Sequence, residues 1–310
     1  MRKNQLTGTL ILLLTAAVWG VSFVAQSASM EYIGPFTFSA IRCMMGTLVL
    51  VPVILGVRAY MLKRPEKYAG SVYVHVFDSN TLKGGVYSGI LLFIASNLQT
   101  IALKTASAGK GGFITAMYII MVPIFGLFLR KKAGFNVWIS VVLAAVGLYL
   151  LCMKEALRFG SDDLLLLACA VFFAIQILAV DKYVPYANGI AMAAIEFAVC
   201  SLLSAPVMLL FENPQWNMIM ECMGALLYAG IGSCGVAYTL QIIGQKYVEP
   251  ATASLVMSLE SVISAISGAL ILHQMMSGRE IWGCALMFAA IVLAQQNIKI
   301  KRLNNVGQQT

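Results

Sequence analysis

Ten apolar runs of membrane-spanning length constrain the fold of this chain more than any other feature of its sequence. The runs lie near 6–26, 35–56, 84–104, 108–129, 134–153, 162–181, 187–211, 221–245, 250–273 and 280–298. A helix needs about 20 apolar residues to cross a ~30 Å hydrocarbon core. In total, 60% of the 310 residues are apolar and 11% are charged, whereas soluble domains average about 45–50% and about 25%. The sequence therefore predicts an all-α integral membrane protein with ten transmembrane helices.

The basic residues indicate how such a protein is oriented, because Lys and Arg gather in cytoplasmic segments. With the N-terminus inside, fifteen of the 21 basic residues fall in cytoplasmic segments, and Arg42 falls within a span. The five on the opposite side are Lys104, Lys110, Lys154, Arg158 and Arg279. This count predicts that both termini lie in the cytoplasm. It also explains the net charge of +8 without a nucleic-acid partner.

The two halves of the chain align with each other at two fixed offsets. An offset of 154 places segment 16–23 on segment 170–177, and Arg42 on Glu196. The pairs at an offset of 142 are Gln99 with Gln241, Lys104 with Lys246, and Tyr118 with Glu260. Internal repeats of this kind are typical of transporters and indicate where the substrate site lies.

Each repeat holds five spans, and an odd number of spans forces the second copy to cross the membrane upside down. The sequence therefore predicts two inverted five-helix repeats, at residues 1–156 and 157–300. We expect a longer cytoplasmic loop at 57–83 and a cytoplasmic tail at 301–310.

Four stretches carry a resemblance to a known family. They are TAAVWGVSFV at 15–24, PFTFSAIR at 35–42, ALKTASAGKGGFITAMYIIMVPIFGLFL at 102–129 and QKYVEPATASLVMSLESVISAISGALIL at 245–272. With these stretches the chain resembles the drug/metabolite transporter superfamily, in particular its EamA-type ten-helix members. The resemblance implies a carrier in the bacterial cytoplasmic (inner) membrane. Such carriers mostly export amino acids, other small metabolites or toxic compounds, using ion gradients or exchange rather than ATP.

The chain departs from the family pattern at several positions. Family members often have Pro after the ninth-helix Glu, whereas Ser261 follows Glu260 here. Gln274 stands where an acidic residue often ends that helix. These departures leave open any kink or gating role that the family assigns to that Pro.

Three charged residues lie well inside predicted spans: Arg42, Glu196 and Glu260. An ion at the bilayer centre costs about 3 kcal/mol on insertion scales, so each needs a partner or a water-lined cavity. Glu260 lies ten residues beyond Pro250, which places it roughly 15 Å deep, near the midplane. Arg42 and Glu196 are expected roughly 8 Å apart in depth. We therefore expect them to line opposite halves of a central cavity, Arg42 nearer the outside, with structural pairing as the alternative.

Other polar and aromatic residues recur at helical spacing and predict the rest of the cavity. The predicted lining residues are Trp19, Ser22, Phe23, Asn97, Tyr118, Gln176, Tyr238 and Gln241. Gln26, Thr100, Thr115 and Gln245 share the same helix faces. For these residues, packing between helices is the alternative role.

The expected cavity chemistry favours a zwitterionic substrate. A carboxylate among aromatic rings suits an ammonium group, and an Arg suits a carboxylate. We therefore predict a secondary active exporter of amino acids or related metabolites, with protons as a possible coupling ion through Glu260. If Arg42 points away from the site, amines, quaternary ammonium compounds or cationic drugs fit better.

The sequence argues against other classes of protein. It contains no HExxH motif, no GxSxG motif with a base and no pair of intramembrane aspartates, so an enzyme is not expected. The seven cysteines show no CxxC spacing, and His75 is far from His273 in sequence, so no metal or cofactor is predicted. We expect a small-molecule substrate and the lipid bilayer as partners, and a monomer or homodimer. A receptor or structural protein without substrate flux remains a remote alternative.

Overall fold

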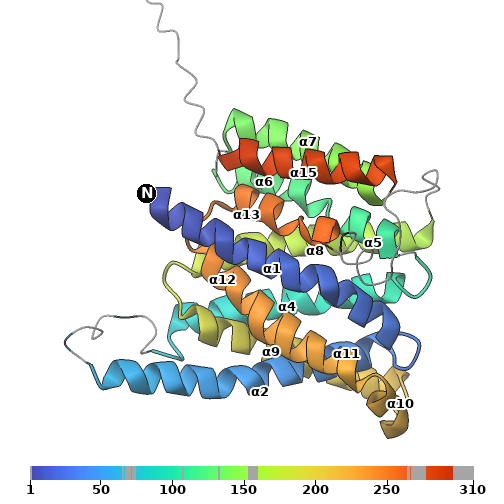
Figure 1. Ribbon diagram of the computed structural model, residues 1–310. Helices are drawn as coiled ribbons and strands as arrows, with labels where there is room; N and C mark the ends of the chain where they lie inside the picture. The colour runs from blue at the N-terminus through green and yellow to red at the C-terminus, as the bar shows by residue number, and fades with distance from the viewer. Residues whose placement is uncertain are drawn as a thin grey trace, which may run out of the picture.

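The computed structural model describes residues 2–64, 66, 71, 75–106, 108–131, 133–152, 160–263, 266 and 277–295. Every regular element in these residues is a helix, and no strand occurs among them. The long helices run side by side across the molecule (Figure 1). The predicted all-α architecture is therefore confirmed.

The first half of the chain supplies five apolar segments. They are α1 (Arg2–Ser29), α2 (Pro35–Leu62), α4 (Ser79–Ala102), the pair α5 (Ala108–Thr115) and α6 (Tyr118–Phe128), and α7 (Phe135–Cys152). Asp78 begins α4 by accepting hydrogen bonds from the amides of Asn80 (2.9 Å) and Thr81 (3.1 Å). Because α2 and α4 extend further than predicted, the connection between them is shorter than segment 57–83.

The second half supplies the other five. They are α8 (Ser161–Tyr183), α9 (Gly189–Phe211), a composite of α11 (Met223–Leu227), η2 (Tyr228–Tyr238) and α12 (Thr239–Gln245), then α13 (Pro250–Met257) and α15 (Gly278–Gln295). A short helix that the sequence analysis did not predict, α10 (Trp216–Glu221), precedes the composite. Most of the predicted ninth span beyond residue 263, residues 296–298 of the tenth and the tail at 301–310 lie outside the described residues.

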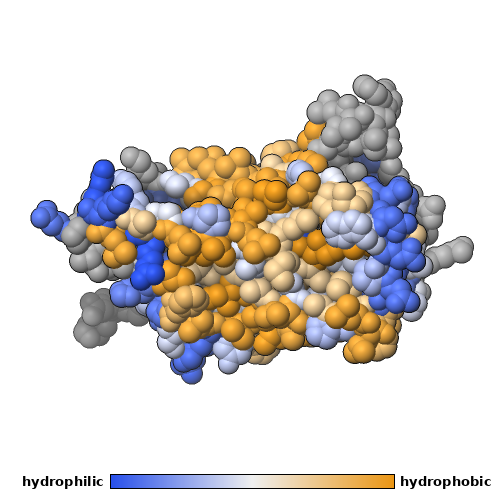
Figure 2. All heavy atoms as spheres, turned by 90° about the horizontal axis from the view of Figure 1, so that it is seen from below, coloured by the Kyte–Doolittle hydropathy of each residue, from blue (hydrophilic) through white to orange (hydrophobic). Residues whose placement is uncertain are grey.

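The described helices are suited to a bilayer. Nine of them are long and apolar enough to cross a membrane, and Pro250–Ile263 forms a shorter apolar helix. Figure 2 shows an apolar band between two hydrophilic ends of the molecule. The outward faces carry large apolar side chains at least 60% exposed, including Leu48, Val142, Leu164, Leu202 and Val292. A bilayer covers such a surface, so the protein is a multi-pass membrane protein.

Helix packing reproduces the repeat found in the sequence. Two contacts join equivalent helices: α2 packs on α9, and α7 packs on α15 (Figure 1). Two others are exchanged when the repeats are exchanged: α4 packs on α8, while α1 packs on η2 and α12. The fold thus consists of two inverted five-helix repeats.

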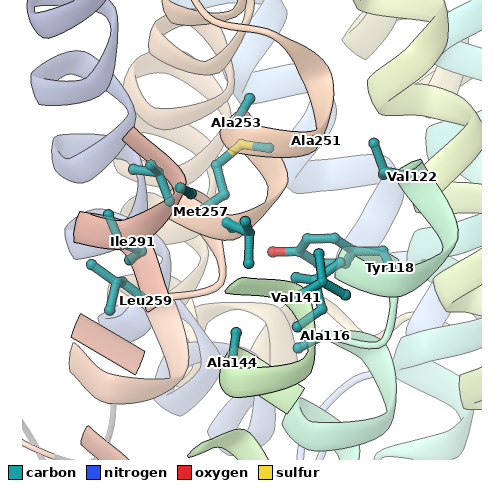
Figure 3. Packing of buried hydrophobic residues seen from close by; sticks show 14 of the residues in the cluster. Ala116, Tyr118, Val122, Val141, Ala144, Ala251, Ala253, Met257, Leu259 and Ile291 are labelled. Atoms are coloured by element: carbon teal, nitrogen blue, oxygen red, sulfur yellow. The ribbon is translucent and has the colours of Figure 1, made fainter. Parts of the chain in front are cut away.

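The largest buried apolar cluster joins the two repeats. It contains residues of α6 and α7 from the first half and of α13 and α15 from the second. Figure 3 shows the ring of Tyr118 reaching from α6 into this cluster toward Met257 of α13. The cluster holds together the two interrupted helices described below.

Candidate functional site

A cavity with about 60 Å³ of space for water-sized molecules lies between the two repeats. The residues that line it are Trp19, Ser22, Gln26, Arg42, Gln99, Thr115, Tyr118, Phe173, Gln176, Ile177, Ser233, Tyr238, Gln241, Met257 and Glu260. Among these residues only Ile177 and Met257 are aliphatic. A polar and aromatic cavity inside an apolar bundle is the usual form of a small-molecule site.

The cavity is lined by equivalent residues of the two repeats. Ten of its lining residues form five pairs at the sequence offsets of 154 and 142: Trp19 with Phe173, Ser22 with Gln176, Gln99 with Gln241, Thr115 with Met257, and Tyr118 with Glu260. Transporters built from inverted repeats bind their substrates at such a repeat interface.

Two helices are interrupted at equivalent positions beside the cavity. The turns at 116–117 and 258–259 are related by the offset of 142. At each turn the backbone tightens to i→i−3 hydrogen bonds. These are Met117 N to Ile114 O (3.1 Å) and Leu259 N to Val256 O (3.2 Å), then Ile119 N to Ala116 O (3.0 Å) and Ser261 N to Ser258 O (3.2 Å). Tightened turns within a helix often mark hinges, and Tyr118 and Glu260 directly follow the two turns.

Glu260 lies at a close approach between α1 and the interrupted helix. A Cβ added at Gly20 would lie 2.7 Å from the Glu260 carbonyl oxygen, so only glycine fits there without a shift. Next to Gly20, Trp19 meets Tyr238 edge to face, with ring centroids 4.6 Å apart. The Trp-Gly pair of α1 therefore contacts both the Tyr238 ring and the backbone of Glu260, and Trp19, Tyr238 and Glu260 all line the cavity.

Arg42 reaches the cavity from α2. Its guanidinium donates a hydrogen bond to the Ser96 hydroxyl and stacks over the Phe38 ring, 5.2 Å from the centroid. In the part of the chain that the structure describes, no acidic side chain forms an ion pair with it. Arg42 and Glu196 therefore do not pair.

Glu196 on α9 is fully buried and connects to the cavity through two glutamines. Gln176 Nε2 donates to Glu196 Oε1 over 2.9 Å, and Gln241 Nε2 donates to Gln176 Oε1 over 3.2 Å. The second oxygen of Glu196 has no hydrogen-bond partner among the described residues. Glu196, Gln176 and Gln241 form a hydrogen-bonded chain, which we call the glutamine relay.

Four buried polar atoms of the lining have no hydrogen-bond partner in the described structure. They are Trp19 Nε1, Arg42 Nε, Tyr118 OH and Gln241 Oε1. Buried polar groups are hydrogen-bonded in the large majority of cases. Convergence of four exceptions on one cavity indicates that its wall is built to meet a polar molecule.

The structure brings together eight of the eleven predicted site residues. Trp19, Ser22, Arg42, Tyr118, Gln176, Tyr238, Gln241 and Glu260 line the cavity. Glu196 lies outside the lining, behind Gln176. Asn97 also lies outside it, because its amide donates to the Phe93 carbonyl (2.7 Å) and to Ser204 Oγ (3.4 Å). The side chain of Phe23 lies outside the described part of the structure.

Seven lining residues were not among the predicted site residues: Gln26, Gln99, Thr115, Phe173, Ile177, Ser233 and Met257. The repeat already indicated several of them. Phe173 and Gln99 are the equivalents of Trp19 and Gln241, and Gln26 and Thr115 share the polar helix faces noted above. Nothing in the sequence pattern indicated Ser233.

Ser233 belongs to an irregular helix. Residues Tyr228–Tyr238 form the π-helix η2, which contributes both Ser233 and Tyr238 to the cavity. The equivalent residues of the first half, 86–96, form regular α-helix in α4. π-helical segments occur frequently at functional sites, and this one makes the two halves of the cavity unlike.

A second cavity lies one helical turn from the first, at the end of the bundle where α6 and α8 end. Its lining includes Val122, Asp181 and Gln245, each four residues beyond the central-cavity residues Tyr118, Ile177 and Gln241. An ion pair between Lys131 and Asp181 lies in its wall. We call this second cavity the vestibule.

No group of three or more metal-ligating side chains occurs among the described residues.

The comparison with protein families is decisive for identity, because the EamA-like transporter family matches residues 6–153 and 161–295. The chain belongs to the EamA-like transporter family. It is accordingly a transporter of the drug/metabolite superfamily and not an enzyme.

Proteins named as transporters resemble the chain over nearly its whole length. An uncharacterized transporter of Archaeoglobus fulgidus is 25% identical over 296 residues, covering 95% of this chain and 88% of the relative. A protein of Rickettsia prowazekii named S-adenosylmethionine uptake transporter is 22% identical, covering 93% and 92%. One solved crystal structure, described only as that of a protein, has a TM-score of 0.75 at 21% identity, covering 93% of this chain and 96% of that one. That last likeness concerns the fold alone.

Proposed function

We propose that this EamA-like transporter exports amino acids or closely related zwitterionic metabolites by alternating access through the central cavity. The observation that supports this most is the mixture of polar groups in the lining. Trp19 Nε1 and Arg42 Nε are donors without a partner, and Gln241 Oε1 is an acceptor without one. The Tyr118 hydroxyl and the Glu260 carboxylate belong to the same lining. A zwitterion satisfies both kinds of group.

The ammonium end of the substrate would lie near Glu260. The carboxylate supplies charge, and the rings of Trp19, Phe173 and Tyr238 supply aromatic faces and edges in the same cavity. Cation–π contact contributes about 0.5–2 kcal/mol, with more at desolvated sites. The substrate carboxylate would lie near Arg42, whose planar guanidinium suits carboxylate geometry.

The two interrupted helices would provide the conformational change. Because the turns at 116–117 and 258–259 are equivalent, bending at one opens one side of the cavity and bending at the other opens the opposite side. The vestibule would be the path to one side, and the layer that contains Ile177 and Gln245 would separate it from the central cavity. The Lys131–Asp181 ion pair lies in the vestibule wall.

Glu260 is our proposed proton carrier. It is 6% exposed and forms no ion pair in the described structure, and burying an ionised group in a bilayer is costly. Binding a proton or an ammonium group removes that cost. Competition between the two for Glu260 would couple export of substrate to entry of protons.

The placement in the cell follows from the sequence. We propose the bacterial cytoplasmic membrane, with both termini and the vestibule on the cytoplasmic side. The repeat boundaries at 1–156 and 157–300, and a monomeric or homodimeric assembly, are part of the same proposal.

A second candidate substrate class is amines, quaternary ammonium compounds or cationic drugs. It is favoured by Arg42, whose guanidinium is already held by Ser96 and Phe38. The name of the Rickettsia prowazekii relative, which includes uptake, concerns that protein. For this reason, both uptake and export of substrate should be measured for the present transporter.

The test is counterflow of pooled labelled amino acids in proteoliposomes, with and without an imposed pH gradient. We expect saturable flux that the gradient accelerates in wild type but not in Glu260→Gln. The matched control is Glu221→Gln, an exposed carboxylate of α10 that is not part of the cavity lining. Equal acceleration in Glu260→Gln refutes the coupling role. If labelled amines are transported and no amino acid is, the substrate belongs to the second class, that of amines, quaternary ammonium compounds or cationic drugs.

A further inference from the structure

The buried carboxylate of Glu196 lies outside the cavity and takes no part in the function proposed above. It is 0% exposed, has no cationic partner among the described residues, and its Oε2 has no hydrogen-bond partner. Its one described hydrogen bond is the one it accepts from Gln176. An isolated buried carboxylate is destabilising, so its presence calls for a purpose beyond packing.

The glutamine relay transmits the polarity of this carboxylate to the cavity wall. Glu196 Oε1 accepts the hydrogen bond from Gln176, and a glutamine amide donates at its NH₂ end and accepts at its carbonyl end. Glu196 therefore turns the NH₂ group of Gln176 toward itself, and the carbonyl of Gln176 turns the NH₂ group of Gln241 toward α8. The carbonyl of Gln241 is the free end of the relay, and it is one of the unpartnered atoms of the lining.

We propose that Glu196 is a positioning residue that fixes the orientation of Gln176 and Gln241, so that the cavity presents a carbonyl acceptor to the ammonium end of its ligand. This inference rests on the proposed function, since it assigns a ligand group to the same cavity. With both amides reversed, Gln241 would present an NH₂ group and repel an ammonium ion. Glu196 thus selects for cationic donors without touching them.

The glutamines of the first repeat show why the relay matters for selectivity. In that half, Gln26 Nε2 donates to Thr100 (2.7 Å) and Gln99 Nε2 donates to Thr115 (3.3 Å). Neither of these glutamines is tied to a carboxylate by the hydrogen bonds of the described structure. The fixed acceptor therefore belongs to the second half, on the residue equivalent to Gln99.

The test is ligand binding to the purified full-length protein in lipid nanodiscs, measured by calorimetry, which requires no flux. The probes are phenethylamine, which carries only the ammonium group, and 3-phenylpropionate, which carries only the carboxylate. In Glu196→Gln, whose amide can turn either end to Gln176, we expect phenethylamine to bind about tenfold more weakly or worse. Binding of 3-phenylpropionate should be unchanged, which also verifies that the variant is folded.

A second variant separates positioning from direct attraction. Gln176→Met breaks the relay, so it should weaken phenethylamine binding as much as Glu196→Gln, and the double variant should be no worse than either. Asn97→Ser, which changes a buried amide outside the relay, is the control and should bind like wild type.

Three results overturn the inference: no binding of phenethylamine by wild type, wild-type binding by Glu196→Gln, or additive losses in the double variant. Normal flux together with any of these leaves the proposed function standing. If the expected binding pattern is found but no substrate flux is measured, the inference about Glu196 stands and the proposed transport function is refuted.

Discussion

Glu212, at the end of α9, contacts the first turn of α2, and this contact should stabilise the folded protein. Gly34, at the N-cap of α2, has no side chain to satisfy the free amides of the first turn. Glu212, at the end of α9, accepts hydrogen bonds from the amides of Phe36 (3.0 Å) and Thr37 (2.7 Å) and from the Thr37 hydroxyl (2.7 Å). A residue of the second repeat therefore caps a helix of the first.

Replacement of Glu212 by Gln keeps the shape of the side chain but removes its charge. Loss of an N-cap costs about 0.5–2 kcal/mol, and a charge at a helix N-terminus contributes about 0.3–1 kcal/mol. We expect Glu212→Gln to lower the free energy of unfolding by about 1–2 kcal/mol. At about 2–4 °C for each kcal/mol, the unfolding midpoint should fall by roughly 2–8 °C.

Thiol reactivity during heating provides the assay, because Cys43, Cys169, Cys200, Cys222 and Cys234 are buried and free. A fluorogenic maleimide reports their exposure as the protein unfolds in detergent. Glu221→Gln is the control and should unfold at the wild-type temperature. Thr37→Val combined with Glu212→Gln should cost less than the sum of the two single changes. An unchanged midpoint in Glu212→Gln would refute the capping role.

Two further predictions concern helix contacts. Gly20→Val should force α1 away from the Glu260 carbonyl, which would lie 2.7 Å from the new Cβ. We expect transport to fall at least tenfold while the protein still folds, and wild-type counterflow would contradict this. For Asp78, burial raises the pKa, but hydrogen bonds from the first turn of α4 outweigh it and hold the pKa below its ordinary value. The cap therefore stabilises the protein above the pKa of the unfolded chain and is lost as the pH falls through the lower folded value. Thermal midpoints of wild type and Asp78→Asn should accordingly differ at pH 7 and converge in acid, and a difference that persists in acid would contradict the charge argument.

Sequence was sufficient for the features that depend on composition along the chain. Apolar runs of about 20 residues predicted the spans, and the repeat offsets paired Tyr118 with Glu260 before their common cavity was known. Depth arithmetic from Pro250 predicted that Glu260 lies near the membrane midplane, and in the structure Glu260 is 6% exposed and lines the central cavity.

The sequence did not predict which side chains face the cavity, because that depends on how each helix is rotated about its axis. Glu196 and Asn97 lie on helices that border the site, yet neighbouring amides and hydroxyls hold both side chains outside the lining. The interruption at 116–117 was not predicted, because Ala116 and Met117 are ordinary helix formers. The π-helix η2 was not predicted either, because an insertion of that kind leaves the apolar run intact.

Alternating access requires that the cavity can be reached from each side of the membrane in turn. Ser22 lines the central cavity and is 7% exposed in this structure. In a background without the seven native cysteines, a cysteine at this position can be labelled with an impermeant maleimide in right-side-out and inside-out vesicles. Alternating access predicts labelling from both sides, slowed in both cases by a transported substrate. Labelling from one side only, under every substrate and pH condition, would contradict alternating access through this cavity.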